Sequence, residues 1–87
     1  METVIAKMLD VLKDDIVDAA LNINDKEKLA RIITNIFIDA ENRNENSSAI
    51  QITRLLQGLE LSGSIAQEDF QRFDSRISNI FALINLD

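Results

Sequence analysis

Apolar residues recur every three or four positions along most of the chain, which is the spacing of an amphipathic helix. In the first stretch these positions are Ile5, Leu9, Leu12, Ile16, Ala19 and Ile23. They predict a helix over about residues 2–22. The next series is Leu29, Ile33, Ile36 and Ala40. It predicts a second helix over about residues 25–42, with Asn24 as the N-cap and Glu27 as its capping-box partner.

The second half of the chain repeats the pattern after a polar run. Residues 42–48 are rich in Asn and Ser, whose side chains compete for backbone hydrogen bonds, so we expect the longest loop here. Ile52, Leu55 and Leu59 then predict a helix over about 48–60 that stops near Gly63. A last helix over about 65–85 is predicted by Ala66, Phe70, Phe73, Ile77, Ile80 and Ile84, with Ser64 as its N-cap.

The scarcity of turn residues favours an all-α fold. The chain has no proline and only two glycines, so the signals that separate strands and hairpins are nearly absent. Four helices with short connections pack as antiparallel neighbours with their apolar stripes facing inward. We therefore predict an up-down-up-down four-helix bundle, formed as a single domain by residues 1–87.

Composition points to a soluble protein of the cytoplasm. With 46% hydrophobic residues the chain can form a core, and it lacks the cysteines that small secreted domains usually need for stabilising disulfide bonds. Residues 1–11 have no apolar run behind a basic segment, so we expect no signal peptide. No apolar run approaches the roughly 20 residues of a membrane span. The formal net charge of -6 disfavours contact with nucleic acid phosphates.

One short motif suggests metal chemistry. The run Asp14-Asp15-Ile16-Val17-Asp18 resembles the aspartate-rich DDxxD motif of prenyl-transferring enzymes. The resemblance implies carboxylates that hold magnesium ions and bind a diphosphate. It covers five residues, and the large helical cavity and second acidic motif of those enzymes do not fit in 87 residues.

The same carboxylates also fit a solvated helix face. Asp10, Asp14 and Asp18 follow one another at four-residue steps, and Lys7 and Lys13 lie close enough to offset part of their mutual repulsion. The chain contains no histidine, cysteine or tyrosine, so the usual nucleophile–base pairs and inward Glu-x-x-His metal ligands are missing. We expect no catalytic residue, no metal and no cofactor.

Some large apolar residues fall outside the inward stripes and are candidates for contact with a partner. They are Val4, Val11, Ile38, Ile50 and Leu61. Single exposed apolar residues are ordinary in soluble proteins, but a contiguous apolar patch marks a binding site. The residues therefore predict a surface for a protein partner or for a second copy of the chain.

The sequence thus favours a small non-enzymatic interaction protein, a regulator, inhibitor or adaptor, with a homodimer as the commonest arrangement. Nothing indicates a small-molecule substrate. A first alternative is a nucleic-acid-associated regulator acting as an oligomer, because Gln51, Arg54 and Gln57 lie on the third predicted helix. A second alternative is a magnesium-dependent enzyme that uses Asp14, Asp15 and Asp18.

Overall fold

Each apolar stripe of the sequence becomes one helix. The structure is a computed structural model that describes residues 2–42 and 45–85. Over these residues the chain forms four helices: α1 (Glu2–Ala19), α2 (Lys26–Asn42), α3 (Glu45–Leu61) and α4 (Gln67–Asn85). None of the described helices is long and apolar enough to cross a membrane.

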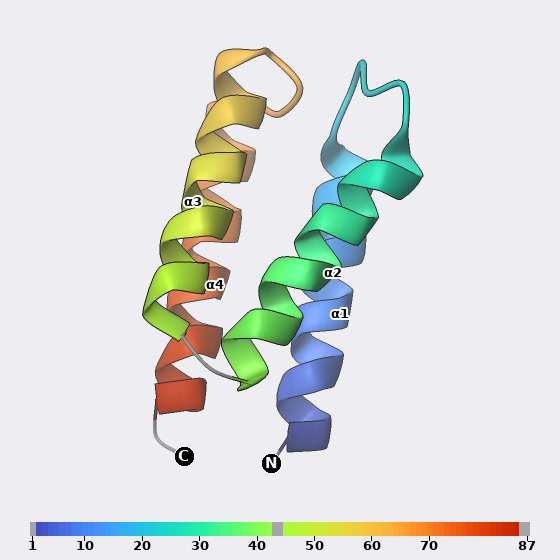
Figure 1. Cartoon of the computed structure of the whole chain (residues 1–87). Helices are drawn as coiled ribbons and strands as arrows, with labels where there is room; N and C mark the ends of the chain where they lie inside the picture. The colour runs from blue at the N-terminus through green and yellow to red at the C-terminus, as the bar shows by residue number, and fades with distance from the viewer. Residues whose placement is uncertain (1, 43–44, 86–87) are drawn as a thin grey trace.

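The helices alternate in direction and pack as a square. Both α1 and α3 lie against α2 and α4, so each helix has two principal neighbours (Figure 1). Successive helices run antiparallel, and the bundle measures 37 × 23 × 20 Å. The predicted all-α, up-down-up-down four-helix bundle is confirmed.

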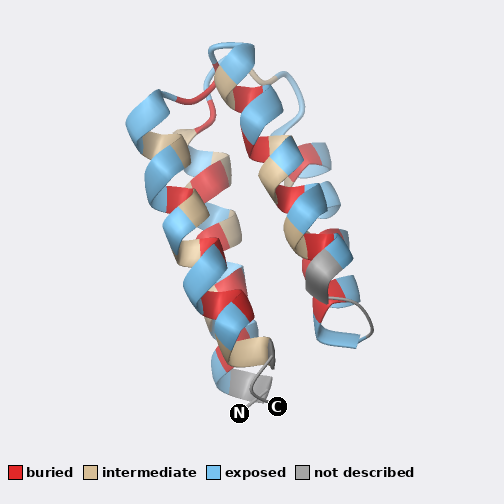
Figure 2. Cartoon of the chain, turned by 90° about the vertical axis from the view of Figure 1, so that its left-hand side faces the viewer, coloured by how far each residue is buried: buried red, intermediate tan, exposed pale blue. Residues whose placement is uncertain are grey.

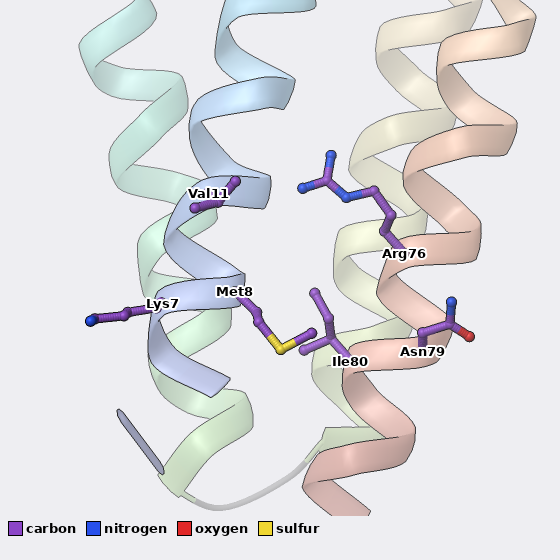
Figure 3. A pocket seen from close by; sticks show the side chains of 6 residues that line it. All are labelled: Lys7, Met8, Val11, Arg76, Asn79 and Ile80. Carbon is purple, nitrogen blue, oxygen red and sulfur yellow. The ribbon is translucent and has the colours of Figure 1, made fainter. Parts of the chain in front are cut away.

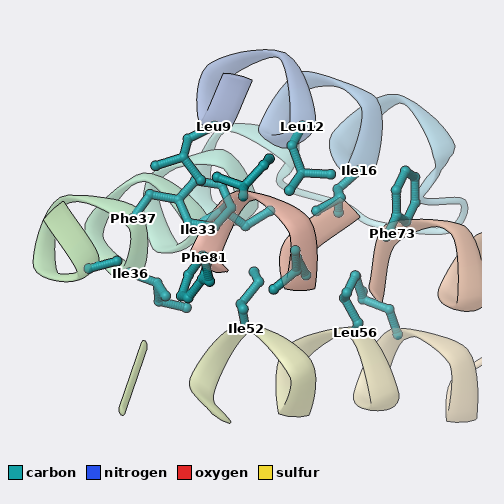
Figure 4. Close-up of a cluster of buried hydrophobic side chains, with 14 of the residues drawn as sticks. Leu9, Leu12, Ile16, Ile33, Ile36, Phe37, Ile52, Leu56, Phe73 and Phe81 are labelled. Carbon is teal, nitrogen blue, oxygen red and sulfur yellow. The ribbon is translucent and has the colours of Figure 1, made fainter. Parts of the chain in front are cut away.

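A continuous apolar core fills the space between the helices. Figure 2 shows buried positions along the inner sides of the helices and exposed positions outside, and Figure 4 shows side chains from all four helices meeting. The core comprises Ile5, Leu9, Leu12, Ile16, Ala20, Leu29, Ile33, Ile36, Phe37, Ala40, Ile52, Leu56, Leu59, Ile65, Phe73, Ile77, Ile80 and Phe81.

The core differs from the predicted stripes mainly where two apolar residues are adjacent. In α3, Leu56 is fully buried and Leu55 only partly. Leu56 continues the inward face of the helix, on which Ile52 and Leu59 also lie at helical spacing. The predicted stripes also omit four buried residues: Ala20, Phe37, Ile65 and Phe81. The remaining differences are at stripe ends: Ala19, Ile23, Phe70 and Ile84 are partly buried, and Ala66 is exposed.

The first helix is shorter than predicted, and its end is tied to the opposite connection. α1 stops at Ala19 rather than near residue 22, because Asn22 adopts a left-handed φ of 60° that cannot continue a right-handed helix. The backbone N–H of Leu21 donates to the carbonyl of Ser64 at 2.8 Å. This bond joins the α1–α2 connection to the α3–α4 connection at one end of the bundle.

The N-terminal caps of α2 and α4 are not the predicted residues. Asp25, not Asn24, caps α2: its Oδ1 accepts the backbone N–H of Lys28 at 3.0 Å. At α4, Asp69 Oδ2 accepts the backbone N–H of Ala66 at 3.3 Å, which is the reciprocal half of a capping box. Ser64, the predicted cap, is instead buried with its hydroxyl 3.1 Å from Ser62 Oγ.

The polar run before α3 is helical over much of its length. Because α3 begins at Glu45, the predicted loop over 42–48 is wrong for residues 45–48, and 43–44 lie outside the described residues. Ser48 is buried one turn before Ile52, so its small side chain extends the inward face of α3. Packing against the bundle outweighs the weak helix propensity of Asn and Ser.

The end of α3 follows the chemistry that the sequence indicated. The backbone N–H groups of Gly63 and Ser64 donate to the carbonyls of Glu60 and Leu59 at 3.0 and 2.8 Å. With φ of 80° at Gly63, this is a Schellman motif, in which glycine takes the left-handed position after the helix. The predicted stop near Gly63 is confirmed.

Candidate interaction surface

A groove runs between α1 and α4 on the outer surface of the bundle, where these two neighbouring helices lie side by side. It has a volume of about 350 Å³ and is lined by Lys7, Met8 and Val11 from α1 and by Arg76, Asn79 and Ile80 from α4 (Figure 3). Val4 lies one turn before Met8 and is exposed. We call these seven residues the α1/α4 face. Its apolar members are spaced i, i+4 and i+7 along α1.

An ion pair closes the α1/α4 face beyond Val11. Arg76 Nη1 donates to Asp15 Oδ2 at 2.8 Å, and both side chains are partly exposed. Asp15 lies one turn after Val11, so the pair joins α1 to α4 at the end of the groove. Helical periodicity carries no signal for this contact, because its partners are 61 positions apart.

The acidic residues of α1 are divided among different surroundings. Lys13 Nζ donates to Asp10 Oδ1 at 2.9 Å and lies 3.5 Å from Asp14 Oδ1. The hydrogen bond to Asp10, helped by the charges of both carboxylates, raises the pKa of Lys13 above its ordinary value. Asp18 is exposed.

The DDxxD-like run therefore does not form a cluster. Ile16 is buried in the core, Asp15 pairs with Arg76 of α4, and Asp14 lies beside Lys13. Across residues 2–42 and 45–85, no three acidic side chains come together as a metal ion would require.

The five apolar residues predicted to contact a partner do not share one face. Val4 and Val11 lie on the α1/α4 face, whereas Ile38 lines a smaller hollow of about 160 Å³ between α1 and α2, beside the charged Asp10 and Lys13. Ile50 and Leu61 lie on α3, the helix diagonal to α1.

The hollow beside Ile50 differs in kind from the α1/α4 groove. It is lined only by α3 residues, among them the polar Thr53, Arg54 and Gln57. Leu61, at the end of the same helix, is 88% exposed. Sequence reasoning also missed two exposed apolar side chains, Leu21 and Ile32.

Five of the six groove residues, all but Val11, were absent from the predicted surface, although a signal existed for Met8. Met8 lies between Val4 and Val11 at helical spacing, so its place beside them was readable from the sequence. Arg76 and Asn79 belong to a helix far away in sequence, and only the pairing of α1 with α4 brings them alongside.

Comparison with known proteins adds no relative. No known protein family matches the chain, and no curated protein or solved structure shows significant similarity to it.

Proposed function

We propose that the chain is a non-enzymatic interaction protein that binds another protein chain through the α1/α4 face. The observation that carries the proposal is the groove itself, which is two helices wide and has Met8, Val11 and Ile80 as its apolar lining. Grooves of this form receive an apolar helix face. Of two further hollows, the one beside Ile38 has the carboxylates of Asp10 and Glu41 in its lining, and the one beside Ile50 is lined by α3 residues alone.

Burial of this face would contribute favourable free energy. Val4 and Val11 are both more than half exposed, and a fully buried valine side chain contributes roughly 1.5–3 kcal/mol relative to an exposed one. A domain of 87 residues also buries a smaller fraction of its surface on folding than a larger domain does, so contact with a partner adds stability that the isolated bundle lacks.

The lining of the groove supports binding rather than catalysis. It contains a lysine, an arginine, an asparagine and three apolar residues, and no carboxylate, hydroxyl or thiol. The absence of cysteine supports a role in the cytoplasm, where small domains manage without disulfides. A regulator, inhibitor or adaptor fits these features.

Site-specific photo-crosslinking in cells that express the chain tests the proposal. A photoreactive phenylalanine analogue replaces Val11 in one variant and Ile50, on the outer face of α3, in the control. Both side chains are 53% exposed, so chance collisions affect them equally. We expect one discrete crosslinked species from position 11 and none from position 50. Equal, diffuse labelling at both positions would overturn the proposal.

A further inference from the structure

The outward side of α1 changes charge along its length. Val4, Lys7, Val11, Asp14 and Asp18 follow one another at steps of three and four residues, so they share one side of the helix. Lys7 lies before Val11, and both aspartates lie after it. All five residues are exposed. This side therefore has an apolar centre, a basic half and an acidic half.

Lys7, Asp14 and Asp18 are the exposed charges of this side, and Lys7 and Asp14 are the two nearest to Val11. Arg76 is neutralised by Asp15 within the same chain at 2.8 Å. Lys13 makes its shorter contact with Asp10 at 2.9 Å, against 3.5 Å to Asp14, whose side chain is 64% exposed. Lys7 and Asp14 are therefore the opposite charges that this side of α1 presents to solvent on either side of Val11.

An antiparallel pair of α1 helices would match these charges. With a two-fold axis at Val11, a residue a given number of positions before Val11 lies opposite the residue the same number after it in the other copy. Lys7, four positions before, then lies opposite the turn that carries Asp14 and Asp15. Of these two carboxylates, Asp14 is the one on the same side of α1 as Lys7, because seven residues separate them. Val11 meets Val11. A parallel pair would instead place Lys7 against Lys7 and Asp14 against Asp14.

We propose that the occupant of the α1/α4 face is a second copy of this chain, docked antiparallel about a two-fold axis at Val11 with Lys7 of each copy facing Asp14 of the other. This inference rests on the proposed function and names its partner. A side of the bundle is 37 Å long and 20–23 Å wide, so an interface of the standard size, roughly 800 Å² per partner, would take up most of one side.

Charge reversal tests the pairing, with molecular mass measured by sedimentation equilibrium across micromolar concentrations. The parent is expected to dimerise. Lys7→Asp alone places like charges together twice, as does Asp14→Lys, so each variant should dimerise about tenfold more weakly or worse. An equimolar mixture of the two variants should form a heterodimer. In it the introduced aspartate of one chain faces the introduced lysine of the other, and the retained Asp14 of the first chain faces the retained Lys7 of the second. The double variant, with both charges exchanged, should dimerise like the parent.

Two control variants separate a specific pairing from general repulsion. Lys28→Asp and Asp39→Lys make the same changes of net charge at exposed positions of α2, and each should dimerise like the parent. Far-ultraviolet circular dichroism of every variant reports whether it is folded. Heterodimer formation in the mixture shows that both charge-reversal variants can still dimerise.

Three results would overturn the inference: a parent that stays monomeric, single reversals that dimerise like the parent, or a mixture that forms no heterodimer. The proposed function fails separately. If the parent is monomeric but position 11 crosslinks to a protein of different mass, the α1/α4 face is still a binding surface and its partner is another protein.

Discussion

The two glycines of the chain should respond to alanine in opposite directions. Gly58 lies inside α3 on an exposed turn, and Gly63 follows the helix in the left-handed conformation with φ of 80°. A Cβ added at either position meets nothing within 4 Å. Steric clash with the rest of the bundle is therefore absent, and only the backbone conformation distinguishes the two substitutions.

The conformational terms set the size of each effect. Alanine is more favourable than glycine inside a helix by about 0.8–1.0 kcal/mol, so Gly58→Ala should raise the free energy of unfolding by about that amount. An L-residue in the left-handed region costs roughly 1–2 kcal/mol, so Gly63→Ala should lower it. The gap of about 2–3 kcal/mol corresponds to roughly 8–24 °C between the two melting temperatures for a domain of this size.

Thermal and urea unfolding followed by circular dichroism at 222 nm measures both variants against the parent. We expect the melting temperature to rise for Gly58→Ala and to fall for Gly63→Ala, with unchanged urea m-values. Two shifts in the same direction would refute the reasoning. A loss of stability in Gly58→Ala would mean that position 58 is packed, and a gain in Gly63→Ala would mean that α3 does not end in a Schellman motif.

Further predictions concern the core and the charges of α1. Truncation of the fully buried Phe73 to alanine should lower the free energy of unfolding by about 3–5 kcal/mol, and Ile77→Ala should lower it by about 2–5 kcal/mol. Thermal midpoints within a few degrees of the parent, or urea midpoints within a few tenths of a molar, would show that α4 is packed differently. Because the pKa of Lys13 is raised, its charged form stabilises the fold at neutral pH, and this contribution should be lost only as the pH rises above about 10.5. A nuclear magnetic resonance titration should show that the pKa of Lys13 falls in Asp10→Asn. An unchanged pKa would contradict the hydrogen bond between Lys13 and Asp10. Calorimetric titration with magnesium or calcium should show no tight binding and Asp14→Asn should be tolerated, whereas micromolar binding abolished by Asp14→Asn would revive the enzymatic alternative.

Helix periodicity was sufficient to predict the bundle because the stripes dominate its energetics. Leu9, Leu12, Ile33, Ile52 and Ile77 were all placed in the core from spacing alone, and all are buried. Burial of apolar area is the main favourable term in folding, so a stripe that repeats over four turns determines which face of its helix turns inward.

Helix ends were predicted less well because short-range choices there are nearly equal in energy. Asn24 and Asp25 are both good N-cap residues, and only the backbone path after α1 selects Asp25. The polar residues at the start of α3 favour a turn locally, yet they are helical in a helix that packs against both α2 and α4. Such decisions depend on neighbouring helices, which a local pattern does not include.

The candidate surface needed the pairing of helices as well as their periodicity. Spacing identified Val4 and Val11 as lying off the inward stripe, and it identified Ile38 and Ile50 equally well. The sequence could not separate these residues onto different faces. Arg76 and Ile80 lie beside Val11 only because α1 packs against α4, and that contact turns a half-exposed valine into part of a groove.

Disulfide trapping is the most direct test of a second copy on the α1/α4 face, because the chain has no cysteine and a single introduced thiol reports one position. Val11→Cys places that thiol at the proposed two-fold axis. In the proposed dimer the Cα atoms of the two residues at position 11 would lie within the roughly 4.4–6.8 Å separation that a disulfide requires. Ile50→Cys is the control, since Val11 and Ile50 are both 53% exposed. Under mild oxidation at micromolar concentration, we expect rapid and nearly complete covalent dimer from Val11→Cys, and only slow dimer formation from Ile50→Cys. Equal rates for the two variants would contradict the proposed dimer.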